Sequence, residues 1–407
     1  DKLVFSDDGA TGTVLNIETI VGGDATESLV FAARAFTIIN LADGNDKITL
    51  GKYNNRLTIS NIETVVGSSL SDNIVVTSES DGVRIDLGAG KDKIVFDQAV
   101  TATLANIETI VGSDEDDDIS VSTISTKSTI DVGDGEDILS LGNFTNTLTI
   151  LNAESIAGGT NVDLVTLGAA AHNVEIDLEG GKDKITLGNF ANTVSLYNVE
   201  TITGGTGKDT VILETKTTAV TINLGDGLDK LVLFETGGTL TVSNVETIIG
   251  TDSGDDVIIL DTQATALTID LGDGLDKLVL DKFNNTLSLS GIEAVVGSTK
   301  TDNLTMLDQM TGGNINLAGG ADRLVLADFE NTLTIASIET LIGGSEDDKI
   351  VVSGLLTKGM IDLGDGEDSL TLGGAANSLT VMNTETIIGG SSTDYVFLGT
   401  QPTAGEF

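Results

Sequence analysis

The chain has 407 residues, with 63 acidic side chains, 20 basic ones and a formal net charge of −43. Such a charge argues against nucleic acids and anionic membranes as partners, because binding to phosphates needs basic patches. The absence of cysteine excludes disulfides and cysteine-based zinc sites, and the single histidine, His172, excludes sites built on a histidine pair and argues against a Ser-His-Asp triad.

A repeat of about 46 residues runs through nearly the whole chain, which is the signature of a stacked-repeat fold. One unit contains Leu224-Gly-Asp-Gly-Leu-Asp-Lys-Leu-Val-Leu233, and the same ten residues recur at 271–280. We call the aspartate before the lysine the first-corner aspartate. It recurs at Asp1, Asp46, Asp92, Asp137, Asp183, Asp229, Asp276, Asp322 and Asp368.

A second corner alternates with the first and reads Asn198-Val-Glu-Thr-Ile-Thr-Gly-Gly-Thr-Gly-Lys-Asp-Thr-Val211 in one copy. We predict that its aspartate, the second-corner aspartate, recurs at Asp72, Asp117, Asp163, Asp209, Asp255, Asp302, Asp348 and Asp394, with Glu27 in the first copy. The glutamate that follows the asparagine recurs at Glu18, Glu63, Glu108, Glu154, Glu200, Glu246, Glu293, Glu339 and Glu385.

Each corner is followed by a short run that alternates apolar and polar residues, such as residues 230–233, then by an asparagine-containing turn and a second run such as 147–150. Period two with β-branched residues predicts strands, and no segment carries a helical period. The sequence therefore predicts an all-β fold: a parallel β-solenoid over residues 1–407, with about nine repeats and two coils per repeat. The crossover rule favours a right-handed coil.

With one corner per coil, we expect both corner types on the same edge of the solenoid, where their aspartates would form a column. Carboxylates one coil apart repel each other unless a cation lies between them. The simpler interpretation is that the aspartates are turn residues, since aspartate bonds its own backbone in turns.

One corner, Gly204-Gly205-Thr206-Gly207-Lys208-Asp209-Thr210-Val211, resembles in full the nonapeptide of hemolysin-type (RTX) calcium-binding repeats. The other corners resemble it in part: first corners keep the fourth-position glycine and the aspartate, and second corners keep the first-position glycine and the aspartate. The expected coil lengths depart from the family, in which two nonapeptides make a coil of about 18 residues.

The resemblance implies a Ca²⁺-dependent β-roll, of the kind found in bacterial surface-layer proteins and large adhesins. It implies that turn carbonyls and the corner aspartates from Asp46 to Asp394 ligate Ca²⁺ between coils, assisted by third-position aspartates. These are Asp43, Asp134, Asp226, Asp273 and Asp365. It also implies export from a Gram-negative bacterium by type I secretion to the cell surface or medium.

Other recurring residues have plainer interpretations. The asparagine before each recurring glutamate is expected to satisfy backbone groups at a bend, and the glutamate to form an exposed face or pair with recurring lysines. Thr-x-Thr pairs such as Thr147 and Thr149 resemble the arrays of ice-binding solenoids, but ordinary strand surface is also rich in threonine. His172 is expected on the surface.

The repeats are uniform and show no singular constellation of catalytic residues, so we expect no enzyme. The first hypothesis is a calcium-stabilised extracellular structural protein of a surface layer, filament or adhesin, with self-association end to end or laterally and a cell-surface glycan as further partner. The alternatives are a non-catalytic module of a secreted lyase or epimerase, and an ice-binding solenoid. The sequence has no apolar run long enough to predict insertion into a membrane. Because Asp1 lies inside a repeat, we expect the chain to be a fragment or processed form of a longer protein.

Overall fold

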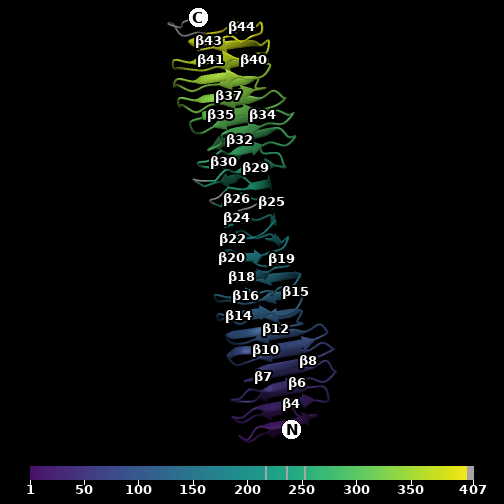
Figure 1. The fold of residues 1–407 in the computed structure, drawn as a ribbon. Coiled ribbons are helices and arrows are strands. Elements are labelled where there is room, and N and C mark those ends of the chain that lie inside the picture. The colour runs from purple at the N-terminus through teal and green to yellow at the C-terminus, as the bar shows by residue number, and fades with distance from the viewer. Residues whose placement is uncertain (216–217, 235–236, 252–253, 401–407) are drawn as a thin grey trace. The chain divides into compact units, whose positions relative to one another are not determined.

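The computed structural model describes residues 1–215, 218–234, 237–251 and 254–400. Within these residues it has 44 β-strands and no helix, and hence no helix that is long and apolar enough to cross a membrane. Successive strands alternate between two parallel sheets, one of odd-numbered and one of even-numbered strands (Figure 1). The predicted parallel β-solenoid is thereby confirmed.

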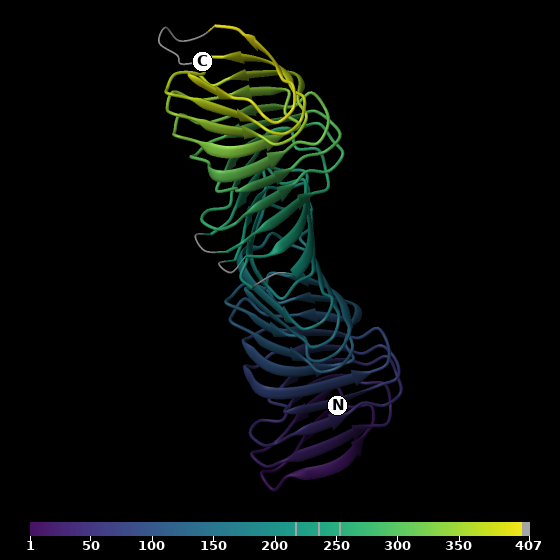
Figure 2. The ribbon, with the colours of Figure 1, turned by 45° about the horizontal axis from the view of Figure 1, so that its top comes forward.

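The chain divides into two compact units, Asp1–Gly207 and Lys208–Phe407. In each unit the coils stack, with one strand of each sheet per coil (Figure 2). The odd-numbered strands of the first unit are β1 (Lys2–Val4), β3 (Thr19–Val21), β5 (Phe36–Asn40), β7 (Arg56–Ser60), β9 (Asn73–Val76), β11 (Lys93–Phe96), β13 (Thr109–Val111), β15 (Thr126–Asp131), β17 (Asn146–Leu151), β19 (Asp163–Leu167), β21 (Lys184–Thr186) and β23 (Thr201–Gly205). Its even-numbered strands are β2 (Ala10–Val14), β4 (Glu27–Phe31), β6 (Lys47–Thr49), β8 (Thr64–Ser68), β10 (Ser80–Gly88), β12 (Val100–Ala105), β14 (Asp118–Val121), β16 (Ile138–Ser140), β18 (Ser155–Gly159), β20 (His172–Glu179) and β22 (Asn192–Tyr197).

The second unit has the same arrangement. Its even-numbered strands are β24 (Asp209–Leu213), β26 (Lys230–Val232), β28 (Thr247–Ile249), β30 (Leu267–Asp270), β32 (Asn285–Ser290), β34 (Asp302–Met306), β36 (Arg323–Val325), β38 (Thr340–Ile342), β40 (Thr357–Asp362), β42 (Ser378–Met382) and β44 (Tyr395–Leu398). Its odd-numbered strands are β25 (Thr218–Gly225), β27 (Thr239–Ser243), β29 (Val257–Leu260), β31 (Lys277–Val279), β33 (Ala294–Val296), β35 (Thr311–Asn316), β37 (Thr332–Ala336), β39 (Lys349–Val352), β41 (Ser369–Leu372) and β43 (Thr386–Ile388).

The alternating pattern of each strand sends one set of side chains into the core. In β17, Leu148 and Ile150 are buried, whereas Thr147 and Thr149 face outward. Parallel pairing places Ile150 beside Ile130 and Leu167 of the neighbouring coils, so branched apolar side chains stack in a continuous file. A coil exposes this file when it stands alone and buries it when it is stacked, which makes the fold cooperative along its axis.

Each 46-residue repeat contributes five strands, which is two and a half coils rather than the two that we predicted. The first-corner aspartates precede β6, β11, β16 and β21 in the first unit. Because five is odd, these strands belong alternately to the even and the odd sheet. The prediction that all corners share one edge is therefore wrong: Asp46 and Asp137 lie where even strands begin, and Asp92 and Asp183 lie where odd strands begin.

Outward threonines form one uninterrupted file in the odd sheet of the first unit. The register places Thr109, Thr129, Thr149, Thr166, Thr186 and Thr203 side by side on β13 to β23. The neighbouring file contains Leu164 and Lys184, so the regular hydroxyl array is one residue wide. This arrangement does not favour ice binding over an ordinary strand surface.

Candidate functional site

Along each edge of the solenoid, the side chains that precede or begin successive strands form a file, which we call the acceptor column. In the first unit, Asn146, Asp163, Asp183 and Glu200 occupy four successive coils where odd strands begin. The backbone N–H of Asn146 donates to Asp163 Oδ1 (3.3 Å), that of Asp163 to Asp183 Oδ1 (2.7 Å), and that of Asp183 to Glu200 Oε2 (2.8 Å). Each coil thus binds the next through a side chain as well as through the strands.

A fifth coil completes the set without a side-chain acceptor of its own. Its backbone N–H, that of Ser125 here, donates to Asn146 Oδ1 (3.0 Å). The same order then recurs along the edge: an asparagine, a second-corner aspartate, a first-corner aspartate, a glutamate and one residue without a side-chain acceptor. The asparagines at this position are Asn55, Asn146, Asn192, Asn285, Asn331 and Asn377, whose place in the column the sequence reasoning missed.

Two of the predictions need correction. In the fifth complete copy of the second corner the buried column residue is Asp256 and not Asp255, which is exposed. The N–H of Asp256 donates to Asp276 Oδ1 (2.7 Å), whereas Asp255 accepts a bond from Leu275 in the turn. The recurring glutamates were expected to be exposed or paired with lysines, yet Glu63 and its equivalents accept the N–H of a first-corner aspartate.

Both carboxylate oxygens accept hydrogen bonds inside the protein in six of the second-corner aspartates, namely Asp72, Asp117, Asp163, Asp302, Asp348 and Asp394. Asp256 differs, because its Oδ2 has no hydrogen-bond partner among the described residues. Asp72 Oδ1 accepts bonds from the backbone N–H (3.1 Å) and the side-chain amide (2.7 Å) of Asn55, and Oδ2 accepts the N–H of Ser68 (3.0 Å). The same pattern recurs at Asp163 and Asp348. These carboxylates already have hydrogen-bond donors in place of a cation, so they do not fit the calcium role that the resemblance implies.

In the eight first-corner aspartates from Asp46 to Asp368, one oxygen of each carboxylate lacks a partner among the described residues. Oδ1 of Asp137 accepts the N–H of Asp117 (2.8 Å), but Oδ2 has no hydrogen-bond partner among the described residues. The same holds for Asp46, Asp92, Asp183, Asp229, Asp276, Asp322 and Asp368, and all eight side chains are at most 1% exposed. A buried carboxylate with an unpartnered oxygen is strongly unfavourable unless a proton or a cation joins it.

Burial perturbs the titration of these groups. Loss of solvent raises the pKa of Asp137 to about 7, against the opposing hydrogen bond from Asp117, and the charges of Asp117 and Glu154 raise it further. The same causes raise the pKa of Asp276 and Asp368 to about 7, and that of the other five to about 6. The folded protein therefore favours neutralised first corners.

A glycine two residues before each first-corner aspartate leaves space beside the carboxylate. A Cβ on Gly135 would lie 2.9 Å from the carbonyl oxygen of Glu115, in the preceding coil, and 3.0 Å from Asp137 Oδ1. Gly44, Gly181, Gly274 and Gly320 have the same surroundings. The glycine thus keeps open a space that a carboxylate and a backbone carbonyl line, and oxygen ligands of this kind are those that Ca²⁺ prefers.

The third-position aspartates, Asp43, Asp134, Asp226, Asp273 and Asp365, are all exposed in the turns that lead to first corners. Within the described ranges, no group of three or more histidine, cysteine, aspartate or glutamate side chains is placed to hold a metal ion. Carbonyl oxygens would therefore have to supply most ligands of a cation at these corners.

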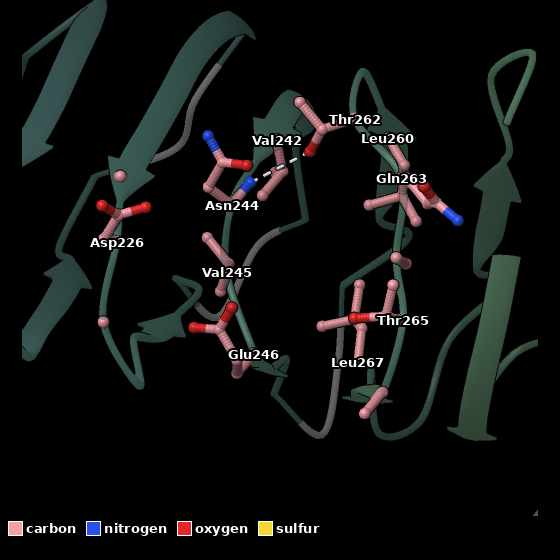
Figure 3. A pocket seen from close by; sticks show the side chains of 14 residues that line it. Asp226, Val242, Asn244, Val245, Glu246, Leu260, Thr262, Gln263, Thr265 and Leu267 are labelled. Carbon is pink, nitrogen blue, oxygen red and sulfur yellow. Dashed lines mark hydrogen bonds between the residues drawn. The ribbon is translucent and has the colours of Figure 1, made fainter.

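An open groove lies beside the column where a glutamate is followed by the coil without an acceptor. In the second unit it has a volume of about 310 Å³. Figure 3 shows Asp226, Asn244 and Glu246 on one side and Thr262 and Thr265 on the other. The Asn244 N–H donates to Thr262 Oγ1 (3.1 Å) across it.

The first unit repeats this groove twice, once around Asp134 and Glu154 and once around Asp43 and Glu63. His172, which is exposed as predicted, lines the former. A groove that recurs with the repeat is a property of the scaffold, whereas an active site requires a constellation that occurs once.

The asparagine before the recurring glutamate lies at a bend, as we expected, but its side chain bonds a side chain of the preceding coil and not backbone groups. Asn61, Asn106, Asn152, Asn244 and Asn383 have positive φ angles of 49° to 60°, a conformation that asparagine tolerates well. The Asn152 side chain donates to Asp131 Oδ1 of the preceding coil (2.7 Å), and the other four make equivalent bonds.

We found no protein-family model and no curated protein that matches this chain.

Proposed function

We propose that this chain is an extracellular structural solenoid that binds Ca²⁺ at its first corners. The observation that carries the proposal is the set of eight buried first-corner carboxylates, each with one unpartnered oxygen. At Asp46, Asp92, Asp183 and Asp276 that oxygen lies 2.8 to 3.0 Å from where a Cβ on the preceding glycine would stand. A cation there would neutralise charge that the fold otherwise leaves buried and uncompensated.

The uniformity of the molecule supports a structural role. Strands, column and grooves recur with the repeat, and the acidic groups follow the same order through both units. An extracellular location is part of the proposal because millimolar calcium sites are typical of extracellular modules. Self-association and membership of a larger secreted enzyme as a non-catalytic module stay predictions.

At a first corner, Asp137 and the carbonyl of Glu115 would hold the ion, which supplies positive charge and no reaction step. The chain's own part is to fix the carboxylate through the N–H of Asp117 and to keep the space open through Gly135. The six second-corner aspartates with both oxygens occupied hold the coils together whether or not calcium is present.

The test is far-UV circular dichroism with thermal melting at pH 7.5, in EDTA and then across a calcium titration, with magnesium as the control ion. We expect the melting temperature to rise with calcium and much less with magnesium, which gives up its water reluctantly. Equal melting temperatures in EDTA and in calcium would contradict the calcium sites and leave the structural solenoid.

A further inference from the structure

Five aromatic side chains, four exposed and one half-buried, lie at the same turn of different repeats. They are Tyr53, Phe144, Phe190, Phe283 and Phe329, each two residues before a column asparagine. Tyr53, Phe190, Phe283 and Phe329 are 37% to 46% exposed, and Phe144 is half-buried. The whole chain has 11 phenylalanines, 3 tyrosines and no tryptophan, so about a third of its aromatic residues are placed at one solvent-facing turn.

Hydrogen bonds fix the backbone of the turn that carries each ring. In the first unit the N–H of Phe144 donates to the carbonyl of Gly142 (2.9 Å), and the Asn146 amide donates to the carbonyl of Phe144 (3.1 Å). A Cβ on Gly142 would lie 2.8 Å from the carbonyl oxygen of Val121 and 3.5 Å, an ordinary contact distance, from the Phe144 ring, so the ring lies beside the backbone of Gly142. A turn that is ordered before binding loses little conformational entropy when a ligand stacks on its ring.

Polar groups lie beside these rings. Next to Phe144, the Asn143 side-chain oxygen accepts bonds from the N–H (3.0 Å) and hydroxyl (3.2 Å) of Thr160, and the Asn161 amide donates to the Asn143 carbonyl (2.8 Å). Next to Phe329, the Gln309 amide donates to the carbonyl of Glu330 (2.6 Å). A flat apolar face flanked by amides and hydroxyls suits a ligand that is apolar on its ring face and polar at its rim.

Repetition and charge define the ligand further. In the first unit Tyr53 and Phe144 precede β7 and β17, five coils apart on the same edge, which corresponds to about 24 Å at the spacing of β-strands. A long polymer of repeating units can engage both rings at once and gain avidity. The net charge of −43 disfavours a polyanion.

We propose that these aromatic turns bind a neutral polysaccharide, whose sugar rings stack on the exposed aromatic faces. This adds a partner to the structural role proposed above and does not depend on calcium at the first corners. The ring contributes nothing to the acceptor column, because the asparagine two residues later makes the column bonds.

The test is native affinity electrophoresis of the full chain through gels that contain a soluble β-glucan, dextran or galactomannan, with alginate as the acidic polymer. At least one neutral polymer should retard the protein. A variant with all five turns changed (Tyr53→Ala, Phe144→Ala, Phe190→Ala, Phe283→Ala and Phe329→Ala) should migrate as in an empty gel. The matched control changes Leu228→Ala and Leu275→Ala, which are 72% and 73% exposed in other turns, and should remain retarded.

Circular dichroism melting checks that the variants fold. If the fivefold variant does not fold, the double variant Tyr53→Ala and Phe144→Ala replaces it, with at least a tenfold loss of affinity expected from lost avidity. The proposal is overturned if no neutral polymer retards the protein, if alginate alone does, or if the variants migrate like the parent. A change in sedimentation without a change in retardation would overturn it in favour of contact between two copies.

Discussion

Two aspartates that look alike in the sequence differ in the number of donors that they meet. Asp163 satisfies donors with both oxygens, whereas Asp183, one coil away, satisfies one donor and leaves its other oxygen unpartnered. The difference lies in the turn itself, because Asp163 Oδ2 accepts the N–H of Gly159, four residues earlier, whereas no described group donates to Oδ2 of Asp183.

The two asparagine variants should therefore behave in opposite ways without calcium. Asp163→Asn turns an amide nitrogen toward an N–H donor and should lower the free energy of unfolding by about 1–3 kcal/mol. Asp183→Asn keeps the acceptor for the Asp163 N–H and removes a buried charge, so stability should stay the same or rise. Urea unfolding in EDTA at pH 7.5, followed by circular dichroism, measures both. Equal destabilisation by the two variants would show that the corners are equivalent.

At the scale of the element, the corner depends on a glycine. Gly135→Ala would bring a methyl group against both the Glu115 carbonyl and the Asp137 carboxylate, closing the proposed calcium space. We expect isothermal titration calorimetry to count one calcium ion fewer than in the parent protein. The control is Gly319→Ala, in the turn before another first corner, because a Cβ there would meet no atom within 4 Å. An unchanged ion count in Gly135→Ala would argue against this site.

Strands were predictable because their apolar residues alternate, but their number was not. The strand Thr109–Val111 is only three residues long and lies directly before the second corner, so it was counted as part of that corner. A fifth strand per repeat was thereby missed, and with it the alternation of corners between the edges. The acceptor column was equally hidden, since its members are 16 to 21 residues apart and depend on the register between coils.

The choice between Asp255 and Asp256 shows the limit of a periodic pattern. A column aspartate must share its parity with the inward residues of the following strand. Val257 and Ile259 share the parity of Asp255, whereas Ile258 and Leu260 share that of Asp256. All four are apolar, so alternation cannot decide, and the hydrogen bond from Asp256 to Asp276 does.

Calcium ligation was predicted from resemblance and stays a proposal.

For the whole molecule, eight buried acids of raised pKa predict a pH dependence. Their pKa values rise from an ordinary 3.8 to about 6 or 7 on folding, so the folded state holds protons more tightly than the unfolded state. Their stabilising contribution is complete below about pH 4 and is lost as pH rises through 6 to 7. In EDTA, the melting temperature should fall between pH 4.5 and 7.5, and calcium should restore it at pH 7.5 only. A melting temperature that rises over this range would contradict the prediction.

The odd number of strands per repeat constrains how such a chain can lengthen or shorten. Removing one 46-residue unit by recombination would shift every later turn by half a coil, so aromatic rings that had faced one partner would emerge on the opposite flank. Removing two units would leave all later residues on their original flanks. Adding or removing repeats in pairs therefore changes the length of the chain and keeps every later turn on its original flank. Deleting a single repeat moves every later turn to the opposite flank.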